Sequence, residues 1–426
     1  MINAILRMNL LLTVPRVFDV VAAIALVALL ASRRWRRWLP IAAAVIVGGL
    51  LLGYVLCWLL GDVLDLFGVD LTWATRTWFA AAIAGTALAI ARMIFSRGRA
   101  ILVGVASALV IVLTGALGIN ADIGEFVSLK EAIGAADFGR LHLPPQSAAL
   151  PVAGWVAPAG MPRLGQVGTA TIPPDASHFQ ARTAYIYLPP AALVAHPARG
   201  EQLHGSAGLS GEHDEDRQPG GMKAVLDAYA ATHAGLAPIV VAPDQLGAFN
   251  HNPMCVDSKL GNAATYVTVD VPNWIRHTFQ TLRGPAAWGV GGFSEGGTCA
   301  IQFGAARPQL FGSIVDISGQ TAPTVGSLQN TIRDGFGGSK ARYEAAIPRN
   351  IMAANGPYLH TLALFGYGAG DTRYGPQARA IASEAKAAGM ETHVFVSPGT
   401  AHDWHTVNFA LKASLTLVSE RWGLNG

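Results

Sequence analysis

The sequence predicts an α/β fold with a mostly parallel sheet, preceded by an α-helical region that crosses a membrane four times. Hydrophobic residues make up 51% of the 426 residues and charged residues only 13%, and the apolar excess lies at the front of the chain. Behind it, apolar runs of strand length alternate with helical segments, which is typical of α/β domains. A glycine-rich turn at residues 289–300, GVGGFSEGGTCA, joins one apolar run to a helix.

The front of the chain contains four apolar segments that approach the roughly 20 residues needed to cross a bilayer. The first is interrupted by Pro15, Arg16 and Asp19, so a signal peptide is the alternative interpretation. No small-residue cleavage site follows it, and three more segments come after, which favours an anchor over residues 1–122. The four segments are Leu10–Ala31, Ile41–Leu60, Trp73–Ile94 and Ile101–Ile119.

The charged residues between these segments predict their orientation. Arginines lie between segments one and two and between segments three and four, whereas the loop between segments two and three carries only acidic residues. The positive-inside rule then places the N-terminus outside and everything from about Asn120 in the extracytoplasmic space. The segments contain no convincing polar relay, which favours a multi-pass cell-membrane anchor over a transport path. The charged residues behind this orientation are Arg33, Arg34, Arg36, Arg37, Arg97 and Arg99 in the first and third loops, and Asp62, Asp65 and Asp70 in the second.

Residues 123–160 are predicted to be a linker. Pro144-Pro145 and the mixture of Ala, Gly and Pro at 148–162 are typical of an irregular connection. A short helix near the membrane is expected within Ser128–Phe138. The domain of α/β type is expected over residues 161–426.

This domain is read as strands and helices in the following order. The expected strands are Gln166–Ile172, Thr183–Leu188, Ala237–Ala242, Ala286–Val290, Gly312–Ile317, Thr361–Phe365 and Thr392–Val396. The expected helices are Met222–His233, Val271–Leu282, Thr298–Ala306, Arg379–Ala388 and Val407–Val418. Since most strands are followed by a helix, the sheet is expected to be largely parallel.

The glycine-rich turn fits the pattern G-x-S-x-G, in which a serine is exposed on a strained turn between a strand and a helix. Ser294 is therefore the candidate nucleophile, and a side chain at Gly292 or Gly296 would crowd the turn. The backbone N–H of Glu295 is the candidate first donor to an oxyanion. A chance Gly-Ser-Gly loop is the alternative, which the flanking strand and helix disfavour.

A nucleophilic serine needs a base to accept its proton and an acid to orient that base. In hydrolases of this fold the chain order is Ser, then Asp or Glu, then His. His402 follows the last strand and is the candidate base, with His405 as the runner-up. Asp371 follows the strand at 361–365 and is the candidate acid, although a turn residue is the alternative. Asp316 lies inside a strand and is expected to be structural.

The remaining composition predicts neither a metal nor a cofactor. No Cys and His residues have metal-ligand spacing, and no glycine-rich phosphate loop is present. Cys57 lies in a predicted span, whereas Cys255 and Cys299 lie in the outer domain, where disulfides can form. Their spacing does not decide whether they form one. The net charge of +3 gives no reason to expect nucleic acid as a partner. The oligomeric state is not predicted.

The second domain resembles the esterase family that includes esterase D-like enzymes and the actinobacterial mycolyltransferases. The resemblance covers roughly residues 237–418 and implies an α/β-hydrolase-type fold with Ser294 as nucleophile, Asp371 as acid and His402 as base. Family members that acylate sugars use Glu as the acid, and here an extra Ala401 precedes His402. The resemblance rests on VPNWI at 271–275, GGFSEGG at 291–297, RPQLF at 307–311 and the loop Gly399–Trp404.

A larger departure lies at residues 196–221, where the family has an apolar strand and a His-Gly-type turn that supplies a second oxyanion N–H. Here the segment is polar, and Leu203-His204-Gly205 alone is similar to that turn, so Gly205 is the candidate second donor. Since a buried parallel strand is normally apolar, the strand is expected to be lost, replaced by a lid, or altered by a local change of reading frame.

These features predict a membrane-anchored, extracytoplasmic serine esterase or acyltransferase that acts on ester-linked envelope or lipid substrates. The alternative is a catalytically inactive envelope binding protein that keeps the hydrolase fold, motivated by the polar segment at 196–221.

Overall fold

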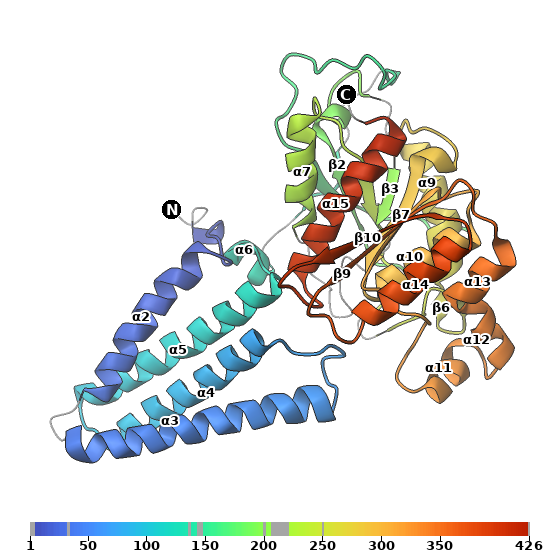
Figure 1. Ribbon diagram of the computed structural model, residues 1–426. Helices are drawn as coiled ribbons and strands as arrows, with labels where there is room; N and C mark the ends of the chain where they lie inside the picture. The colour runs from blue at the N-terminus through green and yellow to red at the C-terminus, as the bar shows by residue number, and fades with distance from the viewer. Residues whose placement is uncertain are drawn as a thin grey trace. The chain divides into compact units, whose positions relative to one another are not determined.

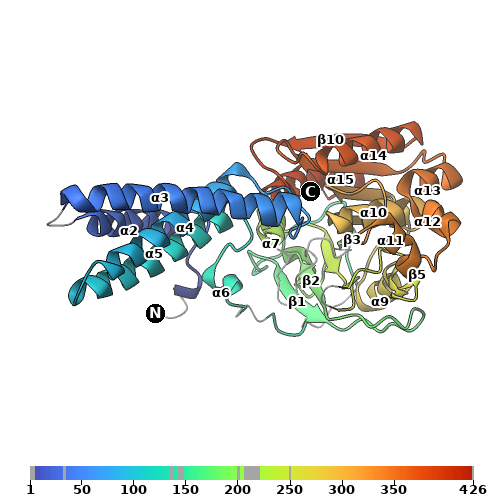
Figure 2. The same ribbon diagram turned by 90° about the horizontal axis from the view of Figure 1, so that it is seen from below.

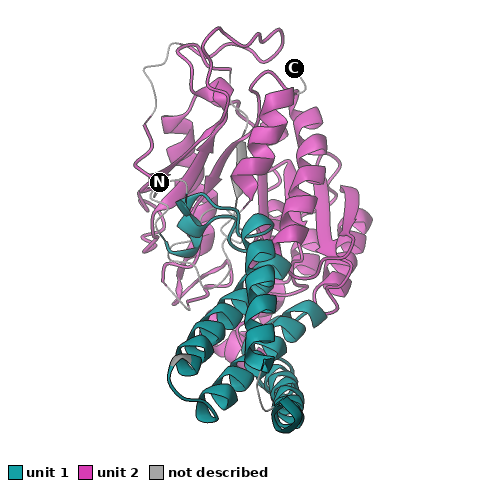
Figure 3. Cartoon of the chain, turned by 90° about the vertical axis from the view of Figure 1, so that its left-hand side faces the viewer, with its two compact units in different colours: residues 1–136 teal, residues 137–426 magenta. Residues whose placement is uncertain are grey.

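The computed structural model describes residues 5–31, 35–134, 138–142, 148–198, 202–205, 221–248 and 251–424. The chain divides into two compact units, Met1–Ala136 and Asp137–Gly426 (Figure 3). Each unit is described by itself below.

The first unit is built from four long helices (Figure 1). They are α2 (Thr13–Leu30), α3 (Trp35–Cys57), which continues as a π-helical turn over Trp58–Val63, α4 (Trp73–Ile94) and α5 (Arg99–Ile123). All four are long and apolar enough to cross a membrane, which agrees with the four segments predicted. The second is longer than predicted at both ends, because Trp35–Pro40 and Gly61–Val63 continue the helical backbone.

Small residues let α3 and α4 approach each other closely. A Cβ atom added to Gly49 would lie 2.5 Å from Cα of Ala84, and one added to Gly53 would lie 2.4 Å from Cα of Ala80. Helices that pack in a membrane commonly use small residues in this way, because close backbone contact increases the van der Waals attraction.

Polar side chains in the first unit bond to one another. Both terminal nitrogens of Arg76 donate to the Asp62 carboxylate, at 2.8 and 2.6 Å. Thr72 and Thr75 donate their hydroxyl groups to Asp122. The charge of Arg76 is therefore paired rather than left to reach the bilayer surface. Arg36, Arg37 and Arg97 are among the described residues, whereas Arg33 and Arg34 lie outside them.

Between the long helices and the sheet, the chain forms one short helix, α6 (Leu129–Ala132). It is shorter than the predicted Ser128–Phe138 and begins with a capping box between Ser128 and Glu131. Further on, Leu141 N–H donates to the carbonyl of Thr169, and Trp155 Nε1 donates to the carbonyl of Ala234. Leu141 and Trp155, which were expected in the linker, therefore belong to the second unit. Pro144 and Pro145 lie outside the described residues.

The second unit contains an eight-stranded sheet with the order β1-β2-β4-β3-β7-β8-β9-β10. The pairs β1–β2 and β2–β4 are antiparallel, and all other neighbours are parallel, which confirms the prediction of a mostly parallel sheet. The strands are β1 (Gln166–Ala170), β2 (Ala184–Leu188), β3 (Gln202–Gly205), β4 (Ile239–Ala242), β7 (Trp288–Phe293), β8 (Ser313–Ile317), β9 (Leu362–Gly368) and β10 (Glu391–Ser397), with a separate small hairpin of β5 (Asp257–Ser258) and β6 (Gly261–Asn262).

Helices cover both faces of this sheet. On one face α7 (Met222–Thr232) and α15 (Trp404–Trp422) contact each other, and Ala410 of α15 packs closely on Gly366 of β9. On the other face α10 (Glu295–Ala306), α13 (Pro348–Asn355) and α14 (Gly375–Ala387) lie side by side (Figure 2). The remaining helices are α8 (Ala263–Thr265), α9 (Val271–Thr278), α11 (Leu328–Gly335) and α12 (Lys340–Ala346), with a π-helical turn at Tyr266–Asp270 and 3₁₀ turns at Pro190–Ala192 and Pro285–Ala287.

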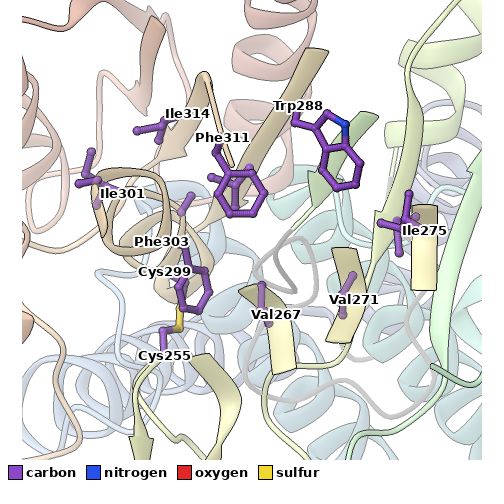
Figure 4. Close-up of a cluster of buried hydrophobic side chains, with 14 of the residues drawn as sticks. Cys255, Val267, Val271, Ile275, Trp288, Cys299, Ile301, Phe303, Phe311 and Ile314 are labelled. Carbon is purple, nitrogen blue, oxygen red and sulfur yellow. A yellow bond between two sulfur atoms is a disulfide. The ribbon is translucent and has the colours of Figure 1, made fainter. Parts of the chain in front are cut away.

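The main hydrophobic core lies between the sheet and the second group of helices. Trp288 and Val290 of β7 belong to one cluster of buried side chains with Ile301 and Phe303 of α10. Figure 4 shows part of this cluster, with Trp288 next to Phe311. Val271 and Ile275 of α9 belong to the same cluster. This packing fixes α10, and with it the residue immediately before the helix, Ser294.

The expectation of a lost or replaced strand at 196–221 is wrong for residues 202–205. These residues form β3, which pairs in parallel with β4 on one side and with β7 on the other. Backbone N–H and C=O groups make these pairs, so polar residue types do not prevent them. Residues 199–201 and 206–220 of this segment lie outside the described residues.

Candidate active site

Ser294 occupies the sharp turn between β7 and α10. Its backbone angles are φ 57° and ψ −118°, a conformation that non-glycine residues seldom adopt. The turn is tight, because a Cβ atom on Gly292 would lie 2.3 Å from the carbonyl oxygen of Gly296. The Ser294 N–H donates to the carbonyl of Ile317 on the neighbouring strand at 2.8 Å. These contacts hold the serine at the carboxyl end of β7.

His402 lies in the loop between β10 and α15, and Asp403 holds this loop. The carboxylate of Asp403 accepts the N–H of Thr406 at 2.9 Å and that of Ala401 at 2.6 Å, so Asp403 caps the helix and fixes the residue before His402. In this position Nε2 of His402 lies 2.9 Å from Oγ of Ser294.

Asp371 follows β9 and faces the other ring nitrogen of the same histidine. Nδ1 of His402 lies 2.9 Å from Oδ2 of Asp371, and the two side chains are 7% and 2% exposed. The acid and base loops are tied together by the Gly370 N–H, which donates to the carbonyl of Thr400 at 2.8 Å. They approach closely because β9 ends in Gly368, where a Cβ atom would lie 2.3 Å from the Ala401 oxygen.

In neutral His402, the hydrogen-bond partners determine which ring nitrogen carries the proton. An ionised carboxylate only accepts hydrogen bonds, so Nδ1 carries the proton and donates it to Asp371. Nε2 is then the acceptor for the Ser294 hydroxyl. The imidazole ring also packs on Phe293 and Tyr374, with ring centroids 4.6 and 4.5 Å away. The ring is therefore oriented by two hydrogen bonds and two aromatic contacts.

The Asp371 carboxylate stays ionised despite its burial. Burial acts to raise its pKa, but hydrogen bonds from His402, from the Tyr374 N–H and from the Ser318 hydroxyl hold the pKa below its ordinary value. An ionised Asp371 is the form that can orient His402 and stabilise its positive charge during a reaction.

His405 and Asp316 occupy other positions. His405 lies in the first turn of α15, and it is His402 whose ring nitrogen lies within hydrogen-bond distance of Ser294. Asp316 lies in β8 and is fully buried, where one carboxylate oxygen accepts the Gly319 N–H at 2.8 Å. Burial raises the pKa of Asp316 to about 7.

The two predicted oxyanion donors lie on neighbouring elements. Glu295 directly follows Ser294 and is the first residue of α10. Gly205 ends β3 and pairs with Gly291 of β7, so it lies at the same sheet edge as Ser294. Their donor roles stay predictions.

A disulfide joins Cys255 to Cys299, which answers the question that their spacing left open (Figure 4). Cys299 lies in α10 and Cys255 in the segment after β4. Asn252 of the same segment donates its side-chain amide to the Glu295 carboxylate. The sulfur atoms and the Glu295 carboxylate lie within 4.8 Å of one another, but sulfurs in a disulfide are not the thiolates that bind metals.

Sequence reasoning missed the residues that support the three central side chains. Ser318, Tyr374 and Phe293 contact Asp371 or His402, and Asn252 contacts Glu295. One available signal was the sequence Ile317-Ser318-Gly319 at the end of a buried strand. The carboxyl ends of parallel strands meet at one sheet edge, where sites of this fold are found.

Comparison with known families assigns the chain to one of them. Residues 178–416, more than half of the chain, match the family model "Esterase", described as putative esterase. The chain belongs to this esterase family. The match spans Ser294, Asp371 and His402. The mostly parallel sheet, with helices on both faces and the sharp turn after β7, is the α/β-hydrolase fold predicted from the resemblance.

One curated relative is an uncharacterized protein of Corynebacterium glutamicum, which is 33% identical over 253 residues. The match covers 58% of this chain and 59% of that protein, so it spans about three fifths of the relative's length.

Solved structures are similar at lower identity. A ferulic acid esterase is 15% identical with a TM-score of 0.49, and the match covers 61% of this chain and 98% of that one. An S-formylglutathione hydrolase from Agrobacterium tumefaciens is 17% identical, with a TM-score of 0.49 and coverages of 62% and 97%. MPT51 of Mycobacterium tuberculosis is 16% identical, with a TM-score of 0.43 and coverages of 61% and 99%.

Proposed function

We propose that this esterase-family chain is a membrane-anchored, extracytoplasmic serine esterase or acyltransferase that uses Ser294, His402 and Asp371. Residues 1–122 would form the anchor, 123–160 the linker and 161–426 the catalytic domain. The single observation that carries the proposal is the pair of 2.9 Å contacts that join the three side chains through the two nitrogens of one imidazole.

The first half of the reaction makes an acyl-enzyme. Ser294 Oγ attacks the ester carbonyl carbon while its proton passes to Nε2 of His402. The negative charge on the carbonyl oxygen is stabilised by backbone N–H groups, for which Glu295 and Gly205 are the candidates. When the intermediate collapses, the carbon–oxygen bond to the leaving alcohol breaks, and His402 returns the proton to that oxygen.

The second half decides between an esterase and an acyltransferase. Water, or the hydroxyl group of a sugar or lipid, gives its proton to His402 and attacks the acyl carbon. Ser294 then leaves and takes the proton back. Water as acceptor gives hydrolysis, and a hydroxyl group as acceptor gives acyl transfer.

The membrane position supports an ester substrate in the envelope or the lipid phase. Four helices are long and apolar enough to cross a bilayer, and the described arginines Arg36, Arg37 and Arg97 lie next to the first and last of the three inter-helix loops. The positive-inside rule then places the catalytic domain outside the cytoplasm. The non-catalytic alternative loses its motivation, because β3 is present in the polar segment.

The test is labelling of the full-length protein by a fluorophosphonate probe, which reacts covalently with an activated serine. The wild type is expected to be labelled, Ser294→Ala to be unlabelled, and His402→Ala to be labelled much more slowly. A folded wild type that is not labelled, or a Ser294→Ala variant labelled as fast as the wild type, would contradict the proposal.

A further inference from the structure

The turn that follows β8 connects the nucleophile to the acid. On one side the carbonyl of Ile317 accepts the Ser294 N–H, and the Gln320 N–H donates to Oγ1 of Thr298 in α10, both at 2.8 Å. On the other side the Ser318 N–H donates to the carbonyl of Gly366 in β9 at 2.7 Å. The turn is therefore held between the strand that precedes Ser294 and the strand that precedes Asp371.

Ser318 is an unusual residue for this turn. Its φ is +51°, a conformation that glycine adopts readily and that is uncommon for other residue types. Its side chain is fully buried. Backbone conformation favours glycine here, so the serine side chain needs a separate explanation.

That explanation is given by the Ser318 hydroxyl, which lies 3.0 Å from Oδ2 of Asp371. Because an ionised carboxylate cannot donate, the hydroxyl is the donor. Oδ2 thus receives both the Ser318 hydroxyl and Nδ1 of His402, while Oδ1 receives the Tyr374 N–H at 2.8 Å. Donors on both oxygens oppose rotation of the carboxylate.

We propose that Ser318 is a positioning residue of this active site, whose hydroxyl holds the Asp371 carboxylate in the orientation that His402 requires. The inference rests on the function proposed above and adds a fourth side chain to it. Ser318 touches neither the substrate nor Ser294 in this role. It acts through Asp371.

Loss of the hydroxyl has two consequences for the reaction. The carboxylate gains freedom to rotate, so His402 is oriented less well and turnover falls. The carboxylate also loses a donor that stabilises its negative charge, and it then stabilises a protonated His402 more strongly. Since the base must be unprotonated to accept the serine proton, the acidic limb of the kcat/KM profile moves to higher pH.

The test compares Ser318→Ala with Ser318→Gly. Both remove the hydroxyl, but glycine also relieves the positive φ. Ser313→Ala is the matched control, because Ser313 is equally buried on β8 and its hydroxyl has no hydrogen-bond partner among the described residues. Rates of ester hydrolysis are normalised to active sites titrated with a fluorophosphonate.

Both Ser318 variants are expected to lose about ten- to hundredfold in kcat/KM per titrated site, since hydrogen bonds to charged groups are worth about 1.5–3 kcal/mol. Their acidic limbs are expected to shift upward, and Ser313→Ala should match the wild type. If Ser318→Gly is as active per site as the wild type, or if only the number of titratable sites falls, the residue serves the backbone and the proposal is overturned.

A second readout separates this proposal from the proposed function. The Nδ1 proton of His402 is followed by NMR in the full chain, with His402→Gln used to assign the resonance. The pH at which this resonance shifts should be higher in both Ser318 variants. If the wild type hydrolyses no ester but this shift is seen, the proposed function fails and the link through Asp371 stands. An unchanged titration in both variants overturns the link itself.

Discussion

Nε2 of His402 lies 2.9 Å from Oγ of Ser294, although 108 positions separate the two residues in the chain. The fold brings them together because β7 and β10 run parallel in one sheet, so both strands end at the same edge.

The base can be distinguished from its neighbour by mutation. His402→Ala is expected to lower kcat/KM for ester hydrolysis by at least about a thousandfold, as loss of a triad member does. His405→Ala should cost much less, because His405 lies in the first turn of α15, and it is the ring of His402 that reaches the serine. Steady-state kinetics of two folded variants check this, and reversed sensitivities would show that the base is misassigned.

The disulfide is expected to stabilise the second unit. Cys255 and Cys299 are 44 positions apart, and closure of such a loop contributes roughly 4 kcal/mol in the chain-entropy description. The double variant Cys255→Ser/Cys299→Ser should therefore unfold at a temperature lower by roughly 5–10 °C. Differential scanning fluorimetry in detergent measures this.

A reductant supplies the control for the same experiment. It should lower the unfolding midpoint of the wild type and leave that of the double variant unchanged, because Cys57 is not part of a disulfide. Equal midpoints for oxidised and reduced wild type would contradict a stabilising role.

The buried Asp316 predicts a pH dependence of stability. Burial raises its pKa to about 7, so the folded state binds this proton more tightly than the unfolded state does. The stability contributed by the neutral form is complete near pH 4 and is lost as pH rises towards 7, by about 1.4 kcal/mol per unit of pKa shift. Asp316→Asn mimics the neutral form, so its unfolding midpoint should match the wild type near pH 4 and exceed it by several degrees at pH 8.

Asp270 provides a contrasting buried carboxylate. Its two oxygens accept the N–H groups of Ala176 and Ser177, so Asp270→Asn would turn a donor towards one of them. This variant should unfold at a lower temperature at both pH values. If Asp316→Asn shows no gain over the wild type at pH 8 relative to pH 4, the account of Asp316 is wrong.

The proposed topology predicts which introduced thiols react from outside the cell. Lys340→Cys lies on an exposed surface of the second unit and should react with an impermeant thiol reagent in intact cells. Ser96→Cys lies between α4 and α5 and should react only after lysis. The native cysteines give little background, since Cys57 is buried and the others are joined. Protection of Lys340→Cys until lysis would rule out the outward orientation.

The central side chains could be predicted because each one lies at most five residues after the end of a strand. Ser294, Asp371 and His402 come after β7, β9 and β10 in the order expected for this fold, and parallel strands end together. Asp371 and His402 are close enough to form a hydrogen bond because β9 ends in Gly368, which has no Cβ atom to collide with the His402 loop. The sequence alone does not show that a glycine is required there.

Other features depended on contacts that a sequence pattern does not contain. Ser318 bonds to a residue 53 positions away. Helix α10 starts at Glu295 rather than at the predicted Thr298, although glycines disfavour helix. Glycine is needed at position 297 because a Cβ atom there would lie 2.5 Å from Asp316. The short helices α11 and α12 were not predicted, since their sequences are largely polar and each spans only about two turns. Strand β3 forms despite its polar sequence, because its backbone pairs with β4 on one side and with β7 on the other.

The most direct test of the central claim is to trap the acyl-enzyme. The full-length protein is mixed with an activated ester, quenched with acid within the first turnovers, digested and analysed by mass spectrometry. The account predicts the mass of the acyl group on the peptide that contains Ser294, and its absence in Ser294→Ala. Ester turnover without this adduct, or an adduct on another residue that survives in Ser294→Ala, would contradict the account.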